Sequence, residues 1–144
     1  MIHKGFRFYP TSFYLAPFWY RHAMMKKSSL NCNNNKPYYK KYLEIIRDFV
    51  NRMNTDINRE TPYFSFNIIN YYKHEYLFLT RDFDLALFDL INEMRHKGYL
   101  DNTLFIIMSD HGSRNSKYST ITAEGRIERS TPLLGIKLPK RLWI

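Results

Sequence analysis

The residues best suited to chemistry are Asp110 and His111, which directly follow an almost continuous apolar run over 103–109. Such a run is typical of a buried strand in a parallel sheet, and open α/β sheets bind ligands beyond the carboxyl ends of their strands. A carboxylate beside an imidazole is a common pair of divalent-metal ligands, and Gly112 allows a sharp backbone turn behind it. The pattern predicts a metal site at Asp110 and His111. The alternative is a loop in which Asp110 accepts backbone N–H bonds and His111 is a surface residue.

A second candidate, His74, lies in the loop 70–79 that follows another predicted strand, residues 63–69. Because parallel strands end at the same edge of a sheet, His74 is expected over the same crevice as Asp110 and His111. There the imidazole can serve a second metal position or donate a hydrogen bond to an anionic ester. A partly exposed loop histidine is the alternative, and the sequence does not separate the two.

Two helices are predicted to support these strands. The first begins near Pro37, which is well tolerated in a first helical turn, and ends at residues 55–58. The second spans 81–97, with Thr80 as its N-cap and Gly98 closing it. Apolar residues recur at helical spacing in both, namely Tyr39, Leu43, Ile46, Val50 and Met53, then Phe83, Leu87, Leu90, Ile91 and Met94.

The order of the elements predicts the fold class. Strand 63–69, helix 81–97 and strand 103–109 form a β-α-β unit, which implies a parallel sheet with a right-handed crossover. A last short strand is expected over 133–138. We therefore expect an α/β fold with parallel strands and flanking helices.

The first part of the chain differs from the rest. Residues 1–35 place prolines beside aromatics and end in a turn-rich stretch, which predicts an irregular, aromatic-rich arm on a larger body over 36–144. Cys32 is the sole cysteine, so no internal disulfide can form. This suits a reducing compartment, or a secreted protein whose partner cysteine lies on another segment.

The net charge of +9 favours anionic partners such as nucleic acid, anionic lipid, or phosphate and sulfate esters. No basic run is long enough to be a tail. A nucleic-acid-binding module needs aromatics exposed among Lys and Arg, whereas many of the 12 Tyr and 11 Phe fall in apolar strands and helix stripes. Nucleic acid is therefore the less favoured partner. No run approaches the roughly 18 apolar residues of a membrane span, and no targeting signal is visible at the N-terminus.

The block 98–112, with Phe64-Ser-Phe-Asn67 and Lys73-His-Glu75 before it, resembles the second half of sulfatase-like domains. The most similar family is the animal domain of unknown function 229, within the alkaline phosphatase superfamily. The resemblance continues through 125–139 and covers nearly the whole chain. It implies an α/β sandwich with a divalent-metal centre, zinc, calcium or similar, that cleaves phosphate or sulfate esters. It also implies a secreted, extracellular or membrane-associated protein.

The resemblance implies roles for individual residues. Asp110 and His111 match the metal ligands of the family's Asp-His-Gly motif, and His74 lies near an active-site histidine of related enzymes. Arg114 would contact the anionic group of the ester. Asn70 stands where some relatives have a ligating aspartate, so a complete second metal site is not expected.

The resemblance also implies that a part of the domain is missing. The superfamily carries its nucleophile and first metal aspartate on the N-terminal half, and Cys32 lacks the Cys-x-Pro-x-Arg setting of a sulfatase nucleophile. We therefore expect a C-terminal portion that is inactive without the N-terminal half or a partner chain. The alternatives are a noncatalytic basic, aromatic-rich binding module for nucleic acid or protein, and a noncatalytic remnant that associates with a partner.

Overall fold

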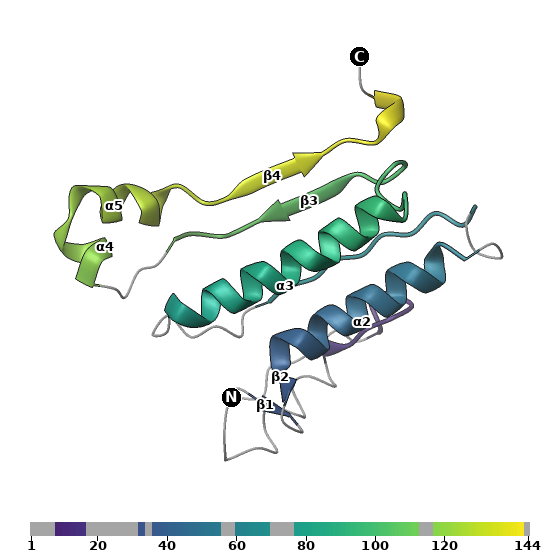
Figure 1. The fold of residues 1–144 in the computed structure, drawn as a ribbon, viewed down its shortest axis with the longest axis horizontal. Helices are drawn as coiled ribbons and strands as arrows, with labels where there is room; N and C mark the ends of the chain where they lie inside the picture. The colour runs from purple at the N-terminus through teal and green to yellow at the C-terminus, as the bar shows by residue number, and fades with distance from the viewer. Residues whose placement is uncertain are drawn as a thin grey trace. The chain divides into compact units, whose positions relative to one another are not determined.

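The computed structural model describes residues 8–16, 32–33, 36–55, 60–69, 77–112 and 117–142 (Figure 1). The chain forms two compact units, Met1–Pro37 and Tyr38–Ile144. In the first unit, β1 (Cys32–Asn33) pairs antiparallel with β2 (Lys36–Pro37). Among its described residues, the second unit holds two long helices, a pair of strands and three short helical segments. None of the helices in these described ranges is long and apolar enough to cross a membrane.

The first long helix, α2 (Tyr38–Met53), confirms the predicted helix after Pro37. The second, α3, spans Leu77–His96 and therefore begins before the predicted start at residue 81. Thr80 lies inside α3 and is not its N-cap, because leucine and phenylalanine residues before it continue the helix at little cost in propensity. The end of α3 is as predicted, since Gly98 adopts a φ of 72°. Tyr99 N donates to Met94 O there and Gly98 N to Arg95 O, which is a Schellman closure.

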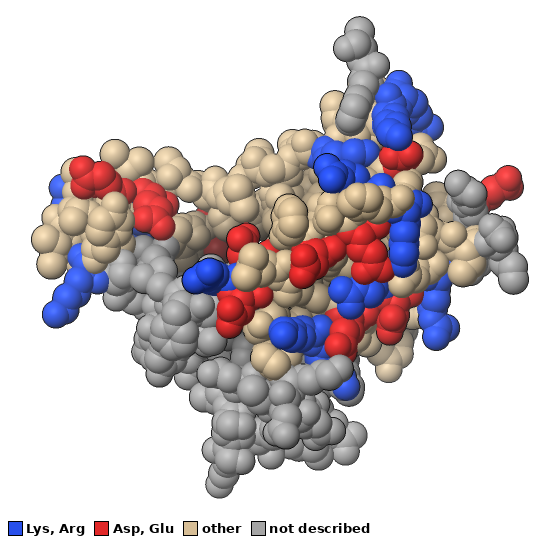
Figure 2. Space-filling view, viewed as in Figure 1, with Lys and Arg blue, Asp and Glu red and all other residues tan. Residues whose placement is uncertain are grey.

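The core of the second unit lies between α2 and α3. Arg47 of α2 and Lys97 both bind the carboxylate of Glu93, at 2.8 and 2.6 Å. Figure 2 shows acidic and basic side chains alternating over the exposed sides of the two helices. Apolar residues between them are buried, and Ile69 and Phe105 pack against this cluster. The buried cluster consists of Tyr39, Leu43, Val50, Leu90, Met94 and Leu100.

Two strands of the second unit form an antiparallel sheet. β3 (Phe105–Met108) pairs with β4 (Leu134–Lys137), with Ile106 opposite Ile136 and Met108 opposite Leu134. Both lie within the strands predicted over 103–109 and 133–138. The mixture of helices and strands agrees with the predicted class, but the predicted parallel pairing is not seen among the described residues.

The strand predicted over 63–69 is not formed. Residues 62–69 lie outside any strand and make no ladder with β3, so the predicted β-α-β unit is absent from the described ranges. Tyr63 meets Phe49 of α2 edge to face at 5.5 Å, and Ile69 packs against the core. Aromatic and β-branched residues favour an extended chain, and here side-chain packing on the helices holds that chain in place of a ladder.

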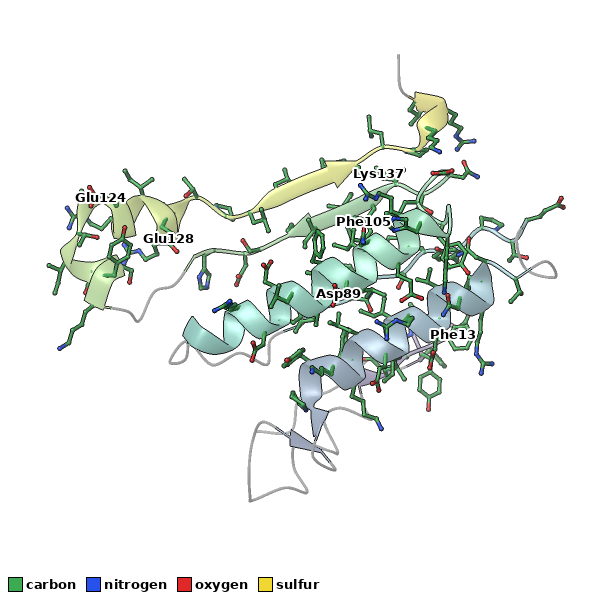
Figure 3. The ribbon with its side chains drawn as sticks, viewed as in Figure 1. Phe13, Asp89, Phe105, Glu124, Glu128 and Lys137 are labelled. Carbon is green, nitrogen blue, oxygen red and sulfur yellow. The ribbon has the colours of Figure 1, made fainter. Side chains whose placement is uncertain are left out.

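Two short helices, which the sequence analysis did not predict, connect β3 to β4. They are α4 (Lys117–Ile121) and α5 (Ala123–Ser130), and α5 carries Glu124 and Glu128 (Figure 3). Thr122 caps α5, since its hydroxyl accepts a hydrogen bond from Gly125 N at 2.9 Å. A short 3₁₀ turn, η1 (Lys140–Leu142), follows β4. Lys140 joins it to Asp101 through a 2.8 Å ion pair.

Candidate metal-binding site at the end of β3

Asp110 and His111 follow β3 in a loop that is held on both sides. Just before them, Ser109 N donates to Leu133 O at 3.0 Å, and Leu133 N donates to the Ser109 hydroxyl at 2.8 Å. Just after them, Gly112 N donates to Arg129 O at 3.2 Å. The loop is thereby tied to the start of β4 and to the end of α5. The backbone that presents the carboxylate and the imidazole is therefore fixed at both ends.

Gly112 is required by close approach. A Cβ at this position would lie 2.3 Å from Glu128 O, well inside contact distance. The glycine with a positive φ among the described residues is Gly98. The sequence analysis expected Gly112 to permit a turn; its main role is to let the loop backbone lie against α5.

The imidazole of His111 is oriented by a neighbouring carbonyl group. Its Nδ1 lies 2.6 Å from Gly112 O. Because a carbonyl oxygen can only accept, Nδ1 carries the hydrogen in this contact. In the neutral ring, Nε2 then offers its lone pair to a cation. A backbone carbonyl on the other ring nitrogen is the usual partner that orients a metal-binding histidine.

The carboxylate of Asp110 faces Nε2 of His111. Asp110 Oδ2 lies 3.3 Å from His111 Nε2, and Asp110 Oδ1 accepts a hydrogen bond from His111 N at 2.9 Å. Two ligand atoms bound about 2.0–2.2 Å from one ion lie about 3–3.5 Å from each other. The pair therefore fits two neighbouring positions around one divalent cation. A proton on Nε2 would make the same contact an ion pair.

Exposure separates the two side chains. That of Asp110 is 87% exposed, whereas that of His111 is 19% exposed. His111 is thus more sheltered than the alternative interpretation expects. The same alternative also expects Asp110 to accept backbone N–H bonds, and Asp110 does accept one, from His111 N. An exposed carboxylate beside a sheltered, oriented imidazole leaves the site open to solvent on the aspartate side.

A shallow hollow adjoins this pair. Its lining residues are Asp110, His111, Arg129, Ser130 and Pro132. Arg129 lies in the last turn of α5 and adds a guanidinium group, which suits an anionic ligand. The sequence analysis did not select Arg129 for the site, because α5, the helix that carries it, was not predicted.

Several predicted residues lie outside the described ranges. His74, Asn70 and Arg114 are among them, so their expected places over the crevice stay predictions. Within the described ranges, no group of three or more His, Cys, Asp and Glu residues is arranged to hold a metal ion. Asp110 and His111 therefore form a two-residue set there.

The chain was compared with known families, curated proteins and solved structures. A family model with the description "Protein of unknown function (DUF229)" matches residues 1–143. No curated protein and no solved structure shows significant similarity to the chain.

Proposed function

The chain belongs to the family described as protein of unknown function (DUF229), and we propose that it is the C-terminal part of a metal-dependent hydrolase of phosphate or sulfate esters. In this proposal the complete domain is of the alkaline phosphatase and sulfatase type. The larger sheet of that domain, with parallel strands, includes β3. The observation that carries the proposal is the pairing of Asp110 Oδ2 with His111 Nε2 at 3.3 Å, directly after an apolar strand.

The residues present fit part of a coordination shell. Asp110 and His111 would hold one divalent cation, zinc, calcium or similar. When bound, such an ion polarises an ester oxygen and stabilises the charge that develops on it. Gly112 O keeps the hydrogen of His111 on Nδ1, so that Nε2 faces the carboxylate. Two ligands are fewer than the three or four of a complete site, so the remaining ligands come from elsewhere in the complete domain.

Two arginines and a histidine are proposed to bind the substrate. Arg129 lines the hollow beside Asp110, where its guanidinium can bind the phosphate or sulfate group in a two-pronged contact. Arg114, four residues after Asp110, is proposed to contact the same anionic group. His74 is proposed to donate a hydrogen bond to the ester. All three roles suit an anionic ester and none requires the nucleophile.

The nucleophile is proposed to lie on the N-terminal half of the complete domain, supplied by a longer chain or by a partner chain. The 144-residue polypeptide alone should then release no product from p-nitrophenyl phosphate or p-nitrophenyl sulfate with Zn²⁺ or Ca²⁺ added. Turnover by this polypeptide that is abolished by Asp110→Ala would contradict the proposal that the nucleophile lies on the N-terminal half. By the same proposal the complete protein is secreted or membrane-associated.

Calorimetric titration of Zn²⁺ or Ca²⁺ into the polypeptide tests the site itself. Replacing a ligand with alanine, as in Asp110→Ala or His111→Ala, should weaken binding at least about tenfold, since even partners of ligands contribute that much. His96→Ala is the matched control, because His96 is an exposed histidine bonded to Asn92 O within α3. Equal metal affinity in all three variants and the unchanged chain would contradict a metal site at Asp110 and His111.

A noncatalytic binding module remains the second candidate, because Phe64 and Phe66 are exposed as aromatics that could stack on bases. Stacking platforms place such rings among Lys and Arg, and the segment 61–69 contains neither. We therefore rank it second. A salt-dependent complex with single-stranded DNA that is lost in a Phe64→Ala, Phe66→Ala double variant, and is indifferent to divalent metal, would favour it.

A further inference from the structure

Among the described residues, the sheet formed by β3 and β4 has one face that is covered and one apolar face that is exposed. On the covered face, Phe105 packs against the core cluster of α2 and α3 (Figure 3). Lys137, opposite Phe105, directs its amino group to Leu100 O. Ile107 and Gly135 form the next pair, and both are partly buried. Helix α3 and the turn that follows it thus serve as the cover of this face.

The other face carries three cross-strand pairs of large apolar side chains. Ile106 faces Ile136, Met108 faces Leu134, and Leu104 and Leu138 continue the register by one step. All six are between 43% and 64% exposed. Directly opposite side chains in an antiparallel pair lie about 4.5–5.5 Å apart, so the six form one continuous surface. We call it the open face; it consists of Leu104, Ile106, Met108, Leu134, Ile136 and Leu138.

The open face is bounded by charge but contains none. In Figure 2, uncharged side chains lie between the charged side chains of α5 and those near η1. Six large apolar side chains at about half exposure present on the order of 500 Å², within the 300–600 Å² of the largest apolar patch on an ordinary monomer, where such patches are often functional. In parallel sheets, such as the one proposed for the complete domain, near-continuous apolar strands are covered by helices on both faces. The open face is therefore an interaction surface.

We propose that a single amphipathic helix of another polypeptide segment covers the open face. The face extends over residues 104–108, which is about 13 Å at 3.3 Å per residue. A helix of about nine residues spans that length, and its diameter of about 10 Å covers two strands. The helix would present apolar residues at i, i+3, i+4 and i+7. We infer that this helix belongs to the part that completes the hydrolase domain, and this identification rests on the proposed function.

The size of the open face argues against a second copy of this chain as the occupant. A stable interface buries about 800 Å² on each partner, more than the open face offers. A partner that also contacts the chain elsewhere does not need to bury the whole 800 Å² on the open face. The surface therefore favours a helix carried by a larger polypeptide over symmetric association of two sheets.

The probe for the experiment is a fluorescent 14-residue peptide of Leu, Glu and Lys with its leucines at i, i+3, i+4 and i+7. A scrambled peptide of the same composition is the peptide control. Fluorescence anisotropy should show that the 144-residue chain binds the patterned peptide in preference to the scrambled one. Ile136→Lys and Met108→Lys should each weaken binding at least about tenfold, because a charge would enter the apolar contact. The matched control is Ile127→Lys, which adds the same charge at a similarly exposed isoleucine of α5.

Equal binding of both peptides, or equal weakening by all three lysine variants, would overturn the inference. A dimer in analytical ultracentrifugation that dissociates on Ile136→Lys would overturn it in favour of a second copy. Metal titration of the same variants separates this inference from the proposed function. Ile136→Lys should leave Zn²⁺ binding unchanged, so a lost metal site with intact peptide binding would sink only the proposed function.

Discussion

The helix pair and the strand pair of the second unit differ in how fully they bury their apolar side chains. Between α2 and α3 the apolar side chains are buried and the outer side is charged, with Glu93 held by both Arg47 and Lys97. The sheet of β3 and β4 packs one face against this core and, among the described residues, leaves its other, apolar face exposed. The helix pair therefore buries its apolar side chains within the described chain, whereas the open face of the strands is proposed to pack against another segment. The candidate site lies at the end of the strands.

The largest expected effect separates a buried from an open apolar residue. Leu90 is 2% exposed between the helices, and Leu90→Ala should lower the free energy of unfolding by about 2–5 kcal/mol. Ile136 lies on the open face, and Ile136→Ala should cost less than about 1 kcal/mol, because 56% of the isoleucine surface stays exposed in the folded chain. Urea denaturation followed by circular dichroism measures both. Similar losses for the two variants would break the comparison.

The next effect tests whether the loop at the candidate site is as tightly packed as the helices. Gly112→Ala would bring a methyl group within 2.3 Å of Glu128 O, so α5 and the loop must separate. We expect a loss of about 1–3 kcal/mol, as for other overpacked positions, together with weaker Zn²⁺ binding at His111. Denaturation and metal titration of the same variant measure the two effects. Normal stability with normal metal binding would show that the loop is loosely held.

The smallest effect concerns the charged side of the helix pair. A hydrogen bond from Lys97 is the largest cause that lowers the pKa of Glu93 from its ordinary value of 4.5. Burial opposes it as the next-largest cause, and contacts with Arg47 add to the lowering. A carboxyl group whose pKa is lowered on folding contributes stability above its unfolded pKa and loses it as the pH falls through the folded pKa. Glu93→Gln should therefore cost less than about 1 kcal/mol at pH 7, since the pair is partly exposed.

The pH dependence checks this sign. The difference in unfolding free energy between Glu93→Gln and the unchanged chain should shrink as the pH falls below 4.5. Denaturation at pH 7, 5 and 3 measures it. A difference that grows on acidification would show that Glu93 has no favourable partner in the folded chain.

Periodicity was the most reliable guide to the fold. The stripe from Tyr39 to Met53 predicts α2 to within a residue at each end, and the apolar runs predict β3 and β4. Strand partners were the part that sequence could not supply, because a near-continuous apolar run is the same whether its neighbour is parallel or antiparallel. The segment 63–69 has strand composition but is held by Tyr63 on α2.

The short helices were missed for another reason. α4 and α5 are five and eight residues long, too short for an apolar period to show. Their packing depends on single residues, since a Cβ at Gly125 would lie 2.2 Å from Tyr118 O. Arg129 was missed with them, because its place beside Asp110 depends on how α5 returns to the loop. The adjacent pair Asp110 and His111 needed no long-range contact, so their nearness was readable from the sequence.

The most direct test of the account is the nitrogen NMR spectrum of His111 during titration with Zn²⁺. The account predicts that Nδ1 carries the hydrogen throughout, held by Gly112 O, and that the Nε2 resonance shifts on metal addition. In Asp110→Ala the shift should require far more metal. If Zn²⁺ leaves the His111 ring unchanged, or if Nδ1 is the nitrogen that responds, the metal site at the end of β3 is wrong.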